Sequence, residues 1–365
     1  MNTVFDVIVI GGGQSGLATG YYLRRAKLNY LILDDREERG GAWQSAWDSL
    51  TLFSPAEHSS LPGWLMPRSE GPFPTRKEVI DYLTRYEERY GFPVQRPVRV
   101  NNIERQDGMF RLITTKGDFY ARTVVAATGT WADPVIPDIE GREAFKGIQL
   151  HSARYKSPET FQGQKVLVVG EGNSGAQIMA EVSKYSREAK WATRKEPEFL
   201  PDEVDGHYLF NIATAKYRAE KEGKPFDRSK YNLGNIVVIP SVKEARSRDV
   251  LRSGGSFTRM YEEGVVWEDG TREAFDAVIW CTGFGYATSF LRNIARQDAK
   301  GIVKTDESRA TEAPGLWLVG YGGWTGYASA TLIGVNRTAR QTVRQIEEYL
   351  KHTEAQIISG VENNR

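Results

Sequence analysis

Short apolar runs alternate with longer amphipathic segments along much of the chain. The runs Val4–Ile10, Tyr30–Leu33 and Lys165–Val169 are mostly apolar and have the length of buried strands. The segments Leu17–Arg25 and Ala176–Ser186, which follow two of these runs, have the apolar spacing of helices. Strands that alternate with helices in this way are typical of parallel sheets. The pattern therefore predicts an α/β fold.

Each of the two strand–helix pairs encloses a glycine-rich loop with the spacing G-x-G-x-x-G, at residues 11–16 and 170–175. Glycines there let the backbone turn sharply and approach a pyrophosphate, which then lies on the N–H groups of the following helix. One such loop is a weak signal. Two loops, each between a strand and a helix, predict two dinucleotide-binding (Rossmann-like) domains, usually one for a flavin and one for a nicotinamide coenzyme.

The second nucleotide domain is expected to be inserted into the first. Two buried strands end in Thr-Gly, at residues 128–129 and 282–283, where a small residue lets the chain cross to another domain. A polar, charged insertion is expected at 200–255. We predict a first domain at 1–140, the inserted domain at 141–284, a return to the first domain at 285–351 and a flexible tail at 352–365.

Composition restricts the classes of partner. Lysine plus arginine (48) nearly balances aspartate plus glutamate (47), so the charge favours neither nucleic acid nor an anionic membrane. No apolar run approaches the ~18 residues of a membrane span. The single cysteine, Cys281, excludes disulfides within the chain, fits a reducing compartment, and cannot form the C-x-x-C dithiol of disulfide reductases. We expect a cytoplasmic protein without a metal site.

Two strand ends carry residues that suit the ribose of a dinucleotide. Asp34 follows the first loop by about 20 residues, where a carboxylate accepts hydrogen bonds from a ribose diol; a solvated strand end is the alternative. In the second domain, the strand Ala189–Thr193 is followed by Arg194 and Lys195. Arginine pairs with a 2′-phosphate, so this turn predicts NADPH in preference to NADH, unless it is only a solvated basic turn. Glu196 adjoins the pair and could weaken that preference.

The run from Phe145 to Tyr155 fits the pattern F-x-G-x-x-x-H-x-x-x-Y. This pattern resembles the fingerprint between the two nucleotide loops of flavin-containing monooxygenases. Together with both loops, the run Gly40–Trp43 and both Thr-Gly crossings, the resemblance covers residues 4–345, and the compact length is similar to that of the small bacterial members. Relatives that perform Baeyer–Villiger oxidation end the fingerprint with tryptophan, where this chain has Tyr155.

The resemblance implies FAD on the first loop and NADPH, with NADH as the alternative, on the second. The residues implied for FAD are Gly11, Gly13, Gln14, Ser15, Gly16, Asp34, Gly41, Trp43, Gln44, Val100, Thr128 and Gly129. The second loop and second crossing supply Gly170, Gly172, Asn173, Ser174, Gly175, Thr282 and Gly283, and the basic turn adds Arg194 and Lys195. A long helix expected at Ser329–Tyr349 would direct its first N–H groups at the pyrimidine edge of the flavin.

The activity implied by the resemblance is NAD(P)H-dependent monooxygenation. NADPH reduces the flavin, O2 forms a flavin hydroperoxide, and the outer oxygen passes to a small sulfide, amine or ketone. The expected partners are therefore a small-molecule substrate and O2, and a homodimer is left open. The alternatives are an NAD(P)H oxidase that produces hydrogen peroxide and a redox-sensing flavoprotein.

Two residues are candidates for catalysis. The fingerprint implies that His151 braces the joint between the domains, and we prefer this interpretation to a catalytic role. Phe53 departs from the family, because many members have an asparagine in a loop that resembles S-L-x-T-N, whereas this chain reads Ser-Leu-Thr-Leu-Phe at residues 49–53. A phenyl ring cannot hydrogen-bond a developing peroxide as an amide can. We therefore expect more hydrogen peroxide to be released per NADPH.

Overall fold

The computed structural model describes residues 3–202, 215, 219, 222–225, 236–326 and 328–362. The chain divides into two compact units, and much of the expected insertion at 200–255 lies outside the described residues. Unit 1 comprises residues 1–44, 55–133 and 285–365, and unit 2 comprises residues 45–54 and 134–284.

A nine-stranded sheet forms the centre of unit 1. In its parallel part, β1 (Val4–Ile10) lies between β2 (Tyr30–Leu33) and β6 (Gly117–Ala126). The strand order is β14-β15-β16-β6-β1-β2-β3, and β5 pairs with both β6 and β4. The remaining strands are β3 (Val94–Gln95), β4 (Val100–Gln106), β5 (Met109–Thr114), β14 (Thr305–Asp306), β15 (Arg309–Ala310) and β16 (Leu316–Leu318).

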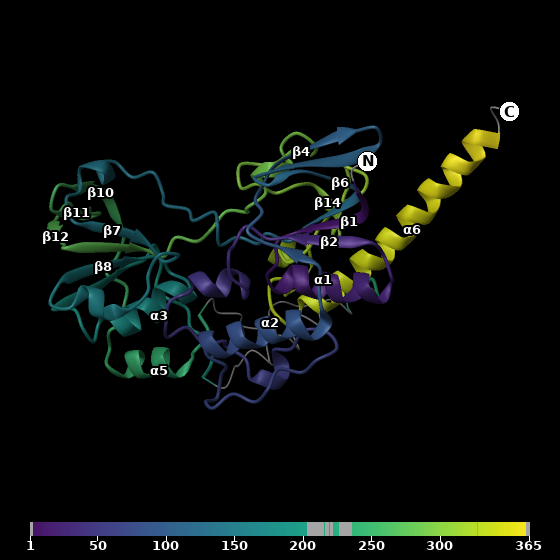
Figure 1. Ribbon diagram of the computed structural model, residues 1–365. Coiled ribbons are helices and arrows are strands. Elements are labelled where there is room, and N and C mark those ends of the chain that lie inside the picture. The colour runs from purple at the N-terminus through teal and green to yellow at the C-terminus, as the bar shows by residue number, and fades with distance from the viewer. Residues whose placement is uncertain are drawn as a thin grey trace. The chain divides into compact units, whose positions relative to one another are not determined.

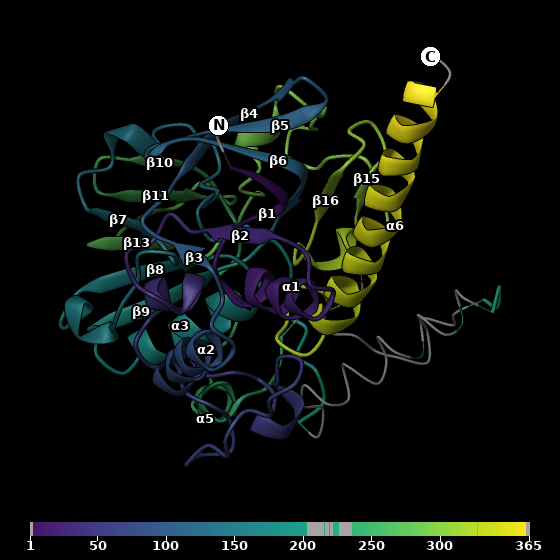
Figure 2. The same cartoon turned by 45° about the vertical axis from the view of Figure 1, so that its right-hand side comes forward.

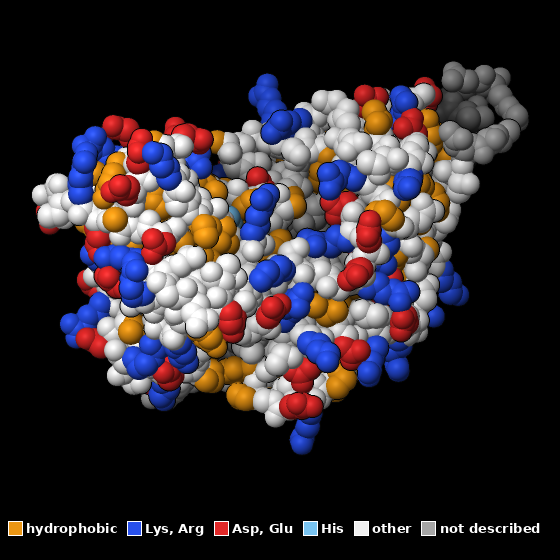
Figure 3. Space-filling model, turned by 60° about the vertical axis from the view of Figure 1, so that its left-hand side comes forward, with side chains coloured by type: hydrophobic (Ala, Val, Ile, Leu, Met, Phe, Trp, Pro, Cys, Tyr) orange, Lys and Arg blue, Asp and Glu red, His pale blue; other side chains and the backbone are white. Residues whose placement is uncertain are grey.

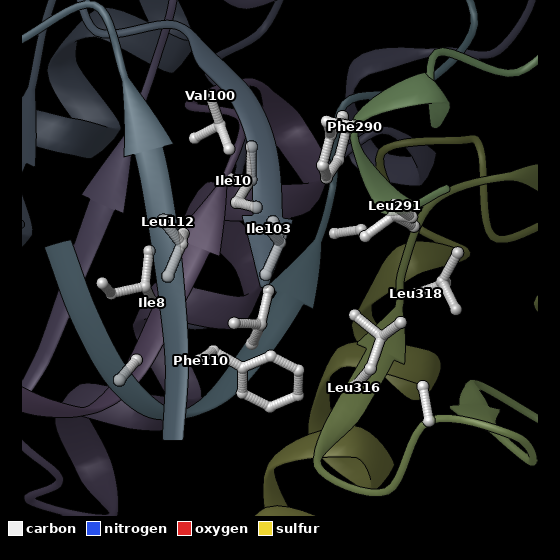
Figure 4. Packing of buried hydrophobic residues seen from close by; sticks show 14 of the residues in the cluster. Ile8, Ile10, Val100, Ile103, Phe110, Leu112, Phe290, Leu291, Leu316 and Leu318 are labelled. Carbon is white, nitrogen blue, oxygen red and sulfur yellow. The ribbon is translucent and has the colours of Figure 1, made fainter. Parts of the chain in front are cut away.

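The core of unit 1 joins the first strands of the chain to the return segment. Ile8 and Ile10 of β1 belong to the same buried cluster as Phe110 of β5, Leu291 and Leu318 (Figure 4). Burial of this apolar surface is the main force that holds the segments together. The end of β1, from which the first glycine loop leaves, is thus fixed by residues from distant parts of the sequence.

The long helices of unit 1 are α1 (Gln14–Arg25), α2 (Arg76–Tyr90) and α6 (Val335–Glu362). Helix α1 and the first turns of α6 lie side by side (Figures 1 and 2). The last helix was expected from residue 329, and this start is wrong. Residues 328–334 form turns, because Ala328 has a left-handed φ of 56° and the Thr331 hydroxyl accepts the Gly334 N–H at 3.0 Å. At its other end the helix includes most of the segment predicted as a flexible tail.

Unit 2 repeats the strand–loop–helix arrangement. Its four-stranded sheet is parallel throughout, in the order β7-β13-β8-β9, and α3 (Asn173–Val182) follows β8. Helix α5 (Pro240–Ser247) packs against α3 (Figure 1). A separate antiparallel sheet, β10-β11-β12, shares a buried core with the parallel one. The strands are β7 (Ile148–His151), β8 (Lys165–Val169), β9 (Glu188–Ala192), β10 (Phe257–Tyr261), β11 (Gly264–Trp267), β12 (Arg272–Ala274) and β13 (Ala277–Trp280).

The predicted fold class, an α/β protein with one Rossmann-like domain inserted into another, is confirmed. The bounds of the units differ from the predicted domains in three respects. Unit 2 contains residues 45–54, its main segment begins at residue 134 instead of 141, and the last segment of unit 1 extends to residue 365 instead of 351. Basic and acidic side chains are interspersed on the face shown in Figure 3, in keeping with the balanced composition. Among the described residues, no helix is long and apolar enough to cross a membrane.

Candidate functional site

The first glycine loop connects β1 to α1, and the glycines at its three G-x-G-x-x-G positions, Gly11, Gly13 and Gly16, serve different purposes. Gly11 has a φ of 110°, and a Cβ there would lie 2.5 Å from the carbonyl oxygen of Ala127. A Cβ on Gly16 would overlap the carbonyl oxygen of Gly11. A Cβ on Gly13 would find, within 4 Å in the described chain, only the Cα of Gly41 at 3.7 Å. Gly11 and Gly16 therefore permit the turn and the close packing, whereas Gly13 leaves open space before the loop.

The second glycine loop, between β8 and α3, divides the same tasks among its glycines. Gly170 has a φ of 126°, and a Cβ there would overlap the carbonyl oxygen of Cys281. A Cβ on Gly175 would overlap the carbonyl oxygen of Gly170, while one on Gly172 would have no described atom within 4 Å. The buried Trp191 of β9 donates from Nε1 to the Gly170 carbonyl at 2.8 Å. The loop is thus anchored at its first glycine and open at its second.

Both helices that follow the loops begin at a glycine N-cap, Gly13 for α1 and Gly172 for α3. Within the described structure, neither N-cap has a side-chain capping hydrogen bond, and neither first turn has an acidic residue. Asn173 Oδ1 instead accepts the main-chain N–H of Val237 at 2.8 Å, and Ser174 follows it in the first turn of α3. Uncapped N–H groups at the positive end of a helix favour an anion. The residues of both loops therefore fit a pyrophosphate.

The side chains of Gln14 and Ser15, at the start of α1, are used within unit 1. Gln14 Nε2 donates to the Ala330 carbonyl at 2.6 Å, and Gln14 Oε1 accepts from Trp43 Nε1 at 3.3 Å. Ser15 is buried, and its hydroxyl lies where a Cβ on Gly320 would be. Any contribution of Gln14 and Ser15 to an anion site would therefore come from their main-chain N–H groups.

The turn that contains Gly41 packs directly against the first loop. Gly41 has a φ of 57°, and a Cβ on it would lie 2.6 Å from the Cα of Gly13. The guanidinium of Arg76, at the start of α2, donates to the carbonyls of Trp43 and Gln44 at 3.0 and 2.8 Å. The sequence-predicted Gly41 and Trp43 thus contact the first loop, and Gln44 follows them in the same turn. The arginine that bonds the carbonyls of Trp43 and Gln44 was not identified in the sequence analysis.

Asp34 is buried at the end of β2 and is paired with a second unidentified arginine. Arg96 donates from Nε to Asp34 Oδ2 at 3.1 Å, and from Nη1 and Nη2 to the two oxygens of Glu87 at 2.7 and 2.8 Å. A Cβ on Gly12 would lie 2.6 Å from Asp34 Oδ2, so the carboxylate lies beside the first loop. Burial raises the pKa of Asp34, and Arg96 opposes that shift. Arg96 therefore keeps a buried carboxylate oriented and favours its charged form.

The first Thr-Gly end ties β6 to the return segment within unit 1. Thr128 Oγ1 donates to the Ala287 carbonyl at 2.6 Å, and the Gly129 carbonyl accepts the Ala287 N–H at 3.1 Å. The Tyr321 hydroxyl accepts the Thr128 N–H at 3.2 Å. Val100, whose backbone was expected near the adenine, is buried in the core of unit 1 at the start of β4. The predicted residues of the first site therefore all lie in unit 1.

The second Thr-Gly end and His151 are joined within unit 2. The Gly283 carbonyl accepts the Val135 N–H at 3.0 Å and lies 2.9 Å from His151 Nε2. Thr282 Oγ1 donates to the Val135 carbonyl. His151 Nδ1 accepts the Ala153 N–H at 3.1 Å, and burial lowers the pKa of His151. Both ring nitrogens thus have backbone partners, a geometry that favours a bracing role over proton transfer.

Phe53 belongs to the segment 45–54, which packs within unit 2. The Ser49 hydroxyl donates to the carboxylate of Glu181 on α3, and the same carboxylate accepts the hydroxyl of Tyr155 at 3.0 Å. Tyr155 is buried, and burial raises the pKa of Glu181. Phe53 is half-buried. The loop that carries Phe53 is thus fastened to the end of the fingerprint and to the helix of the second glycine loop.

Arg194 and Lys195 follow β9, and Arg194 is paired with an acid that the sequence analysis left unassigned. Arg194 Nη2 donates to Glu171 Oε1 at 2.8 Å, and the Arg194 main-chain N–H donates to Glu171 Oε2 at 3.1 Å. The Lys195 carbonyl accepts the Thr193 hydroxyl at 2.7 Å. Glu196 was the acid expected to influence the basic turn, but the residue that binds Arg194 is Glu171, inside the second loop.

No group of three or more His, Cys, Asp or Glu side chains in the described part of the chain could hold a metal ion. Cys281 is buried after β13, and burial raises the pKa of its thiol. A thiol of this kind is inert because the reactive form is the thiolate.

Comparisons with known proteins agree with this description. A family model described as pyridine nucleotide-disulphide oxidoreductase matches residues 8–208. The chain is 30% identical to an uncharacterized CzcO-like oxidoreductase of Geobacillus kaustophilus (strain HTA426), over 95% of this chain and 99% of that protein. It is 26% identical to indole-3-pyruvate monooxygenase YUCCA1 of Oryza sativa subsp. japonica, over 93% and 90%. A solved flavin-containing monooxygenase from Stenotrophomonas maltophilia is 48% identical, with a TM-score of 0.87, over 96% of this chain and 100% of that one.

The resemblance to flavin-containing monooxygenases, first carried by short motifs, is thus confirmed over nearly the whole chain. The family description includes disulphide chemistry, but the single Cys281 cannot form a dithiol within the chain. The residues matched by the family model, 8–208, contain both glycine loops. The chain is an oxidoreductase and belongs to the pyridine nucleotide-disulphide oxidoreductase family.

Proposed function

We propose that this chain is an FAD-containing, NADPH-dependent monooxygenase that oxygenates small soft nucleophiles such as sulfides and amines, or ketones. The observation that carries the proposal is the repeated loop geometry, in which the central glycines, Gly13 and Gly172, each face open space at an uncapped helix start. The 48% identity to a flavin-containing monooxygenase supports the same conclusion.

FAD would be held by unit 1. The N–H groups at the start of α1 would bind its pyrophosphate, and Asp34, kept oriented by Arg96, would accept hydrogen bonds from its ribose. Gly41 and Trp43 lie beside the same loop, where they would pack on the cofactor. A bound FAD supplies the two-electron chemistry that links NADPH to O2.

NADPH would be held by unit 2. The start of α3 offers its N–H groups beside the open Gly172, and the basic turn at Arg194 and Lys195 would bind the 2′-phosphate. The chain's own task is then to bind and align the two coenzymes and to exclude water. We assign no proton transfer to His151, because both of its ring nitrogens have backbone partners.

An NAD(P)H oxidase that releases hydrogen peroxide is the second candidate, and Phe53 is the observation that favours it. Its ring offers no hydrogen bond to a reduced oxygen species, whereas the asparagine that the resemblance leads us to expect at this position would. The oxidase would use the same two coenzymes at the same loops. The two candidates therefore differ only in where the oxygen goes.

One experiment separates these candidates. The purified protein is first tested for bound FAD, and NADPH consumption, peroxide release and product are then measured in air with a panel of sulfides, amines and ketones. A monooxygenase gives oxygenated product by mass spectrometry in proportion to NADPH. An oxidase gives peroxide equal to NADPH with every compound, and very slow consumption throughout would favour a redox sensor. A protein that binds no FAD after reconstitution would refute the proposal.

A further inference from the structure

Glu171 occupies the variable position between the first two glycines of the second loop. Both of its carboxylate oxygens accept hydrogen bonds from Arg194, and the main-chain N–H of Lys195 is a further partner of the carboxylate. Oε1 accepts Nη2 of Arg194 at 2.8 Å, and Oε2 accepts the main-chain N–H of Arg194 at 3.1 Å. Arg194 is also the residue proposed to bind the 2′-phosphate of NADPH. The same guanidinium therefore has two possible anionic partners, one built into the loop and one carried by the coenzyme.

The Arg194 side chain can leave its partner at little cost. It is 82% exposed, whereas the Glu171 side chain is 29% exposed, and ion pairs at such exposed sites are weak. The turn itself is fixed independently, because the Thr193 hydroxyl bonds the Ser253 hydroxyl at 2.6 Å and the Lys195 carbonyl at 2.7 Å. A ligand could thus take the guanidinium without moving the backbone of the turn.

The charges oppose such an exchange. Arg194 holds the pKa of Glu171 below its ordinary value, so the carboxylate is ionised at neutral pH. A 2′-phosphate that takes the guanidinium removes one hydrogen bond from Glu171 and places more negative charge near it. A coenzyme with a free 2′-hydroxyl, such as NADH, does not need the Arg194 guanidinium. The Glu171 carboxylate could accept a hydrogen bond from its ribose diol, as carboxylates do in other dinucleotide sites.

We propose that Glu171 is a specificity-determining residue that competes with the 2′-phosphate of NADPH for Arg194 and so limits the preference for NADPH over NADH. This inference rests on the proposed binding of a nicotinamide coenzyme to the second loop. The expectation from sequence assigned such an influence to the neighbouring Glu196, and the experiment below compares the two acids.

The test uses the FAD-loaded protein and coenzyme fragments that cannot be turned over. Dissociation constants for 2′,5′-ADP and 5′-AMP are measured by calorimetry for the wild type, Glu171→Gln, Glu196→Gln and Arg194→Ala. Glutamine keeps an oxygen for the Arg194 main-chain N–H and removes the charge. Glu196→Gln is the matched control, because it removes an equal charge close to the same arginine without removing a carboxylate bonded to it.

We expect Glu171→Gln to lower the dissociation constant for 2′,5′-ADP by about three- to fivefold, the range that an exposed charge interaction supports. The dissociation constant for 5′-AMP should change by less than about twofold. Glu196→Gln should change neither of these two dissociation constants by more than about twofold. KM for NADPH, measured in parallel, should fall in Glu171→Gln while KM for NADH does not. If Glu171→Gln binds 2′,5′-ADP more weakly than the wild type or equally well, the proposed competition is refuted. Weaker binding would mean that Glu171 positions Arg194 for the phosphate.

The same data separate a failure of the inference from a failure of the proposed function. If Arg194→Ala weakens the binding of 2′,5′-ADP but Glu171→Gln leaves that binding unchanged, the coenzyme site is supported and the competition is refuted. If neither fragment binds the wild type at millimolar concentration, the assignment of the second loop to a nicotinamide coenzyme is wrong, and the inference falls with it.

Discussion

Replacing Gly13 by alanine should separate flavin binding from folding. The φ of Gly13 is −82°, which alanine adopts without strain, and the nearest described atom to the added methyl is the Gly41 Cα at an ordinary contact distance of 3.7 Å. Alanine is a poorer N-cap than glycine, but it also restricts the unfolded chain, and each effect is worth about 0.5–1 kcal/mol. The flavin-free variant should therefore be about as stable as the flavin-free wild type.

The effect on FAD should be much larger, because the methyl fills the space that the glycine leaves open before the first N–H groups of α1. A pyrophosphate pushed away from these groups loses at least one charge-assisted hydrogen bond, worth about 1.5–3 kcal/mol. That loss corresponds to a dissociation constant for FAD about 10- to 150-fold higher. The increase in melting temperature that excess FAD produces should therefore be smaller for Gly13→Ala than for the wild type.

The assay measures FAD content on purification, the dissociation constant by fluorescence titration of the flavin-free protein, and melting temperatures with and without FAD. Gly172→Ala makes the same change at the open position of the second loop, so it should leave FAD binding intact and raise KM for NADPH. Gly16→Ala, whose Cβ would overlap the Gly11 carbonyl, should destabilise even the flavin-free protein. A Gly13→Ala protein with full flavin content and an unchanged dissociation constant would refute the assignment of this loop.

Three further predictions concern unit 2. Arg194→Ala should raise KM for NADPH about tenfold or more and leave KM for NADH nearly unchanged, since it removes the charge-assisted pair with the 2′-phosphate. Equal increases in KM for both coenzymes would exclude this role of Arg194. Phe53→Asn should raise the ratio of oxygenated product to NADPH and lower peroxide release, with Phe53→Leu as the apolar control. A wild type that already couples tightly would contradict that reasoning. Because burial lowers the pKa of His151, its contribution to stability is complete above the unfolded pKa of about 6.5 and is lost as the pH falls through the folded value. The melting temperature of the wild type should therefore fall more steeply than that of His151→Gln below about pH 6.5, and parallel slopes would show that His151 does not titrate in this way.

The elements that the sequence predicts well are those set by short-range constraints. The strands at Val4–Ile10, Tyr30–Leu33 and Lys165–Val169 have the predicted bounds, because a buried parallel strand is a continuous apolar run. Both helices begin earlier than expected, at Gln14 and Asn173, because the last residues of each glycine loop already form the first helical turn.

The side-chain pairs at the sites could not be predicted in the same way. Arg96 is 62 residues from Asp34, and Glu171 is 23 residues from Arg194. Each pair forms only because parallel strands bring the ends of β2 and β3, or of β8 and β9, to the same edge of a sheet. The sequence shows which strands exist but not their order in the sheet, so the charged partners of Asp34 and Arg194 could not be predicted from it.

The segment 45–54 makes the inserted unit dependent on a part of the chain far from its own sequence. The Lys156 carbonyl accepts the Asp48 N–H at 3.0 Å, and the Trp47 ring stands edge-on to Tyr155 with centroids 6.3 Å apart. A fragment of residues 134–284 would lose the Asp48 N–H at the Lys156 carbonyl, the Trp47 ring at Tyr155 and the Ser49 hydroxyl at the Glu181 carboxylate. Unit 2, the proposed site of the nicotinamide coenzyme, is therefore not a contiguous segment that can be transferred by itself. A chimera that exchanges it between relatives has to carry residues 45–54 from the same parent, or it will join mismatched surfaces.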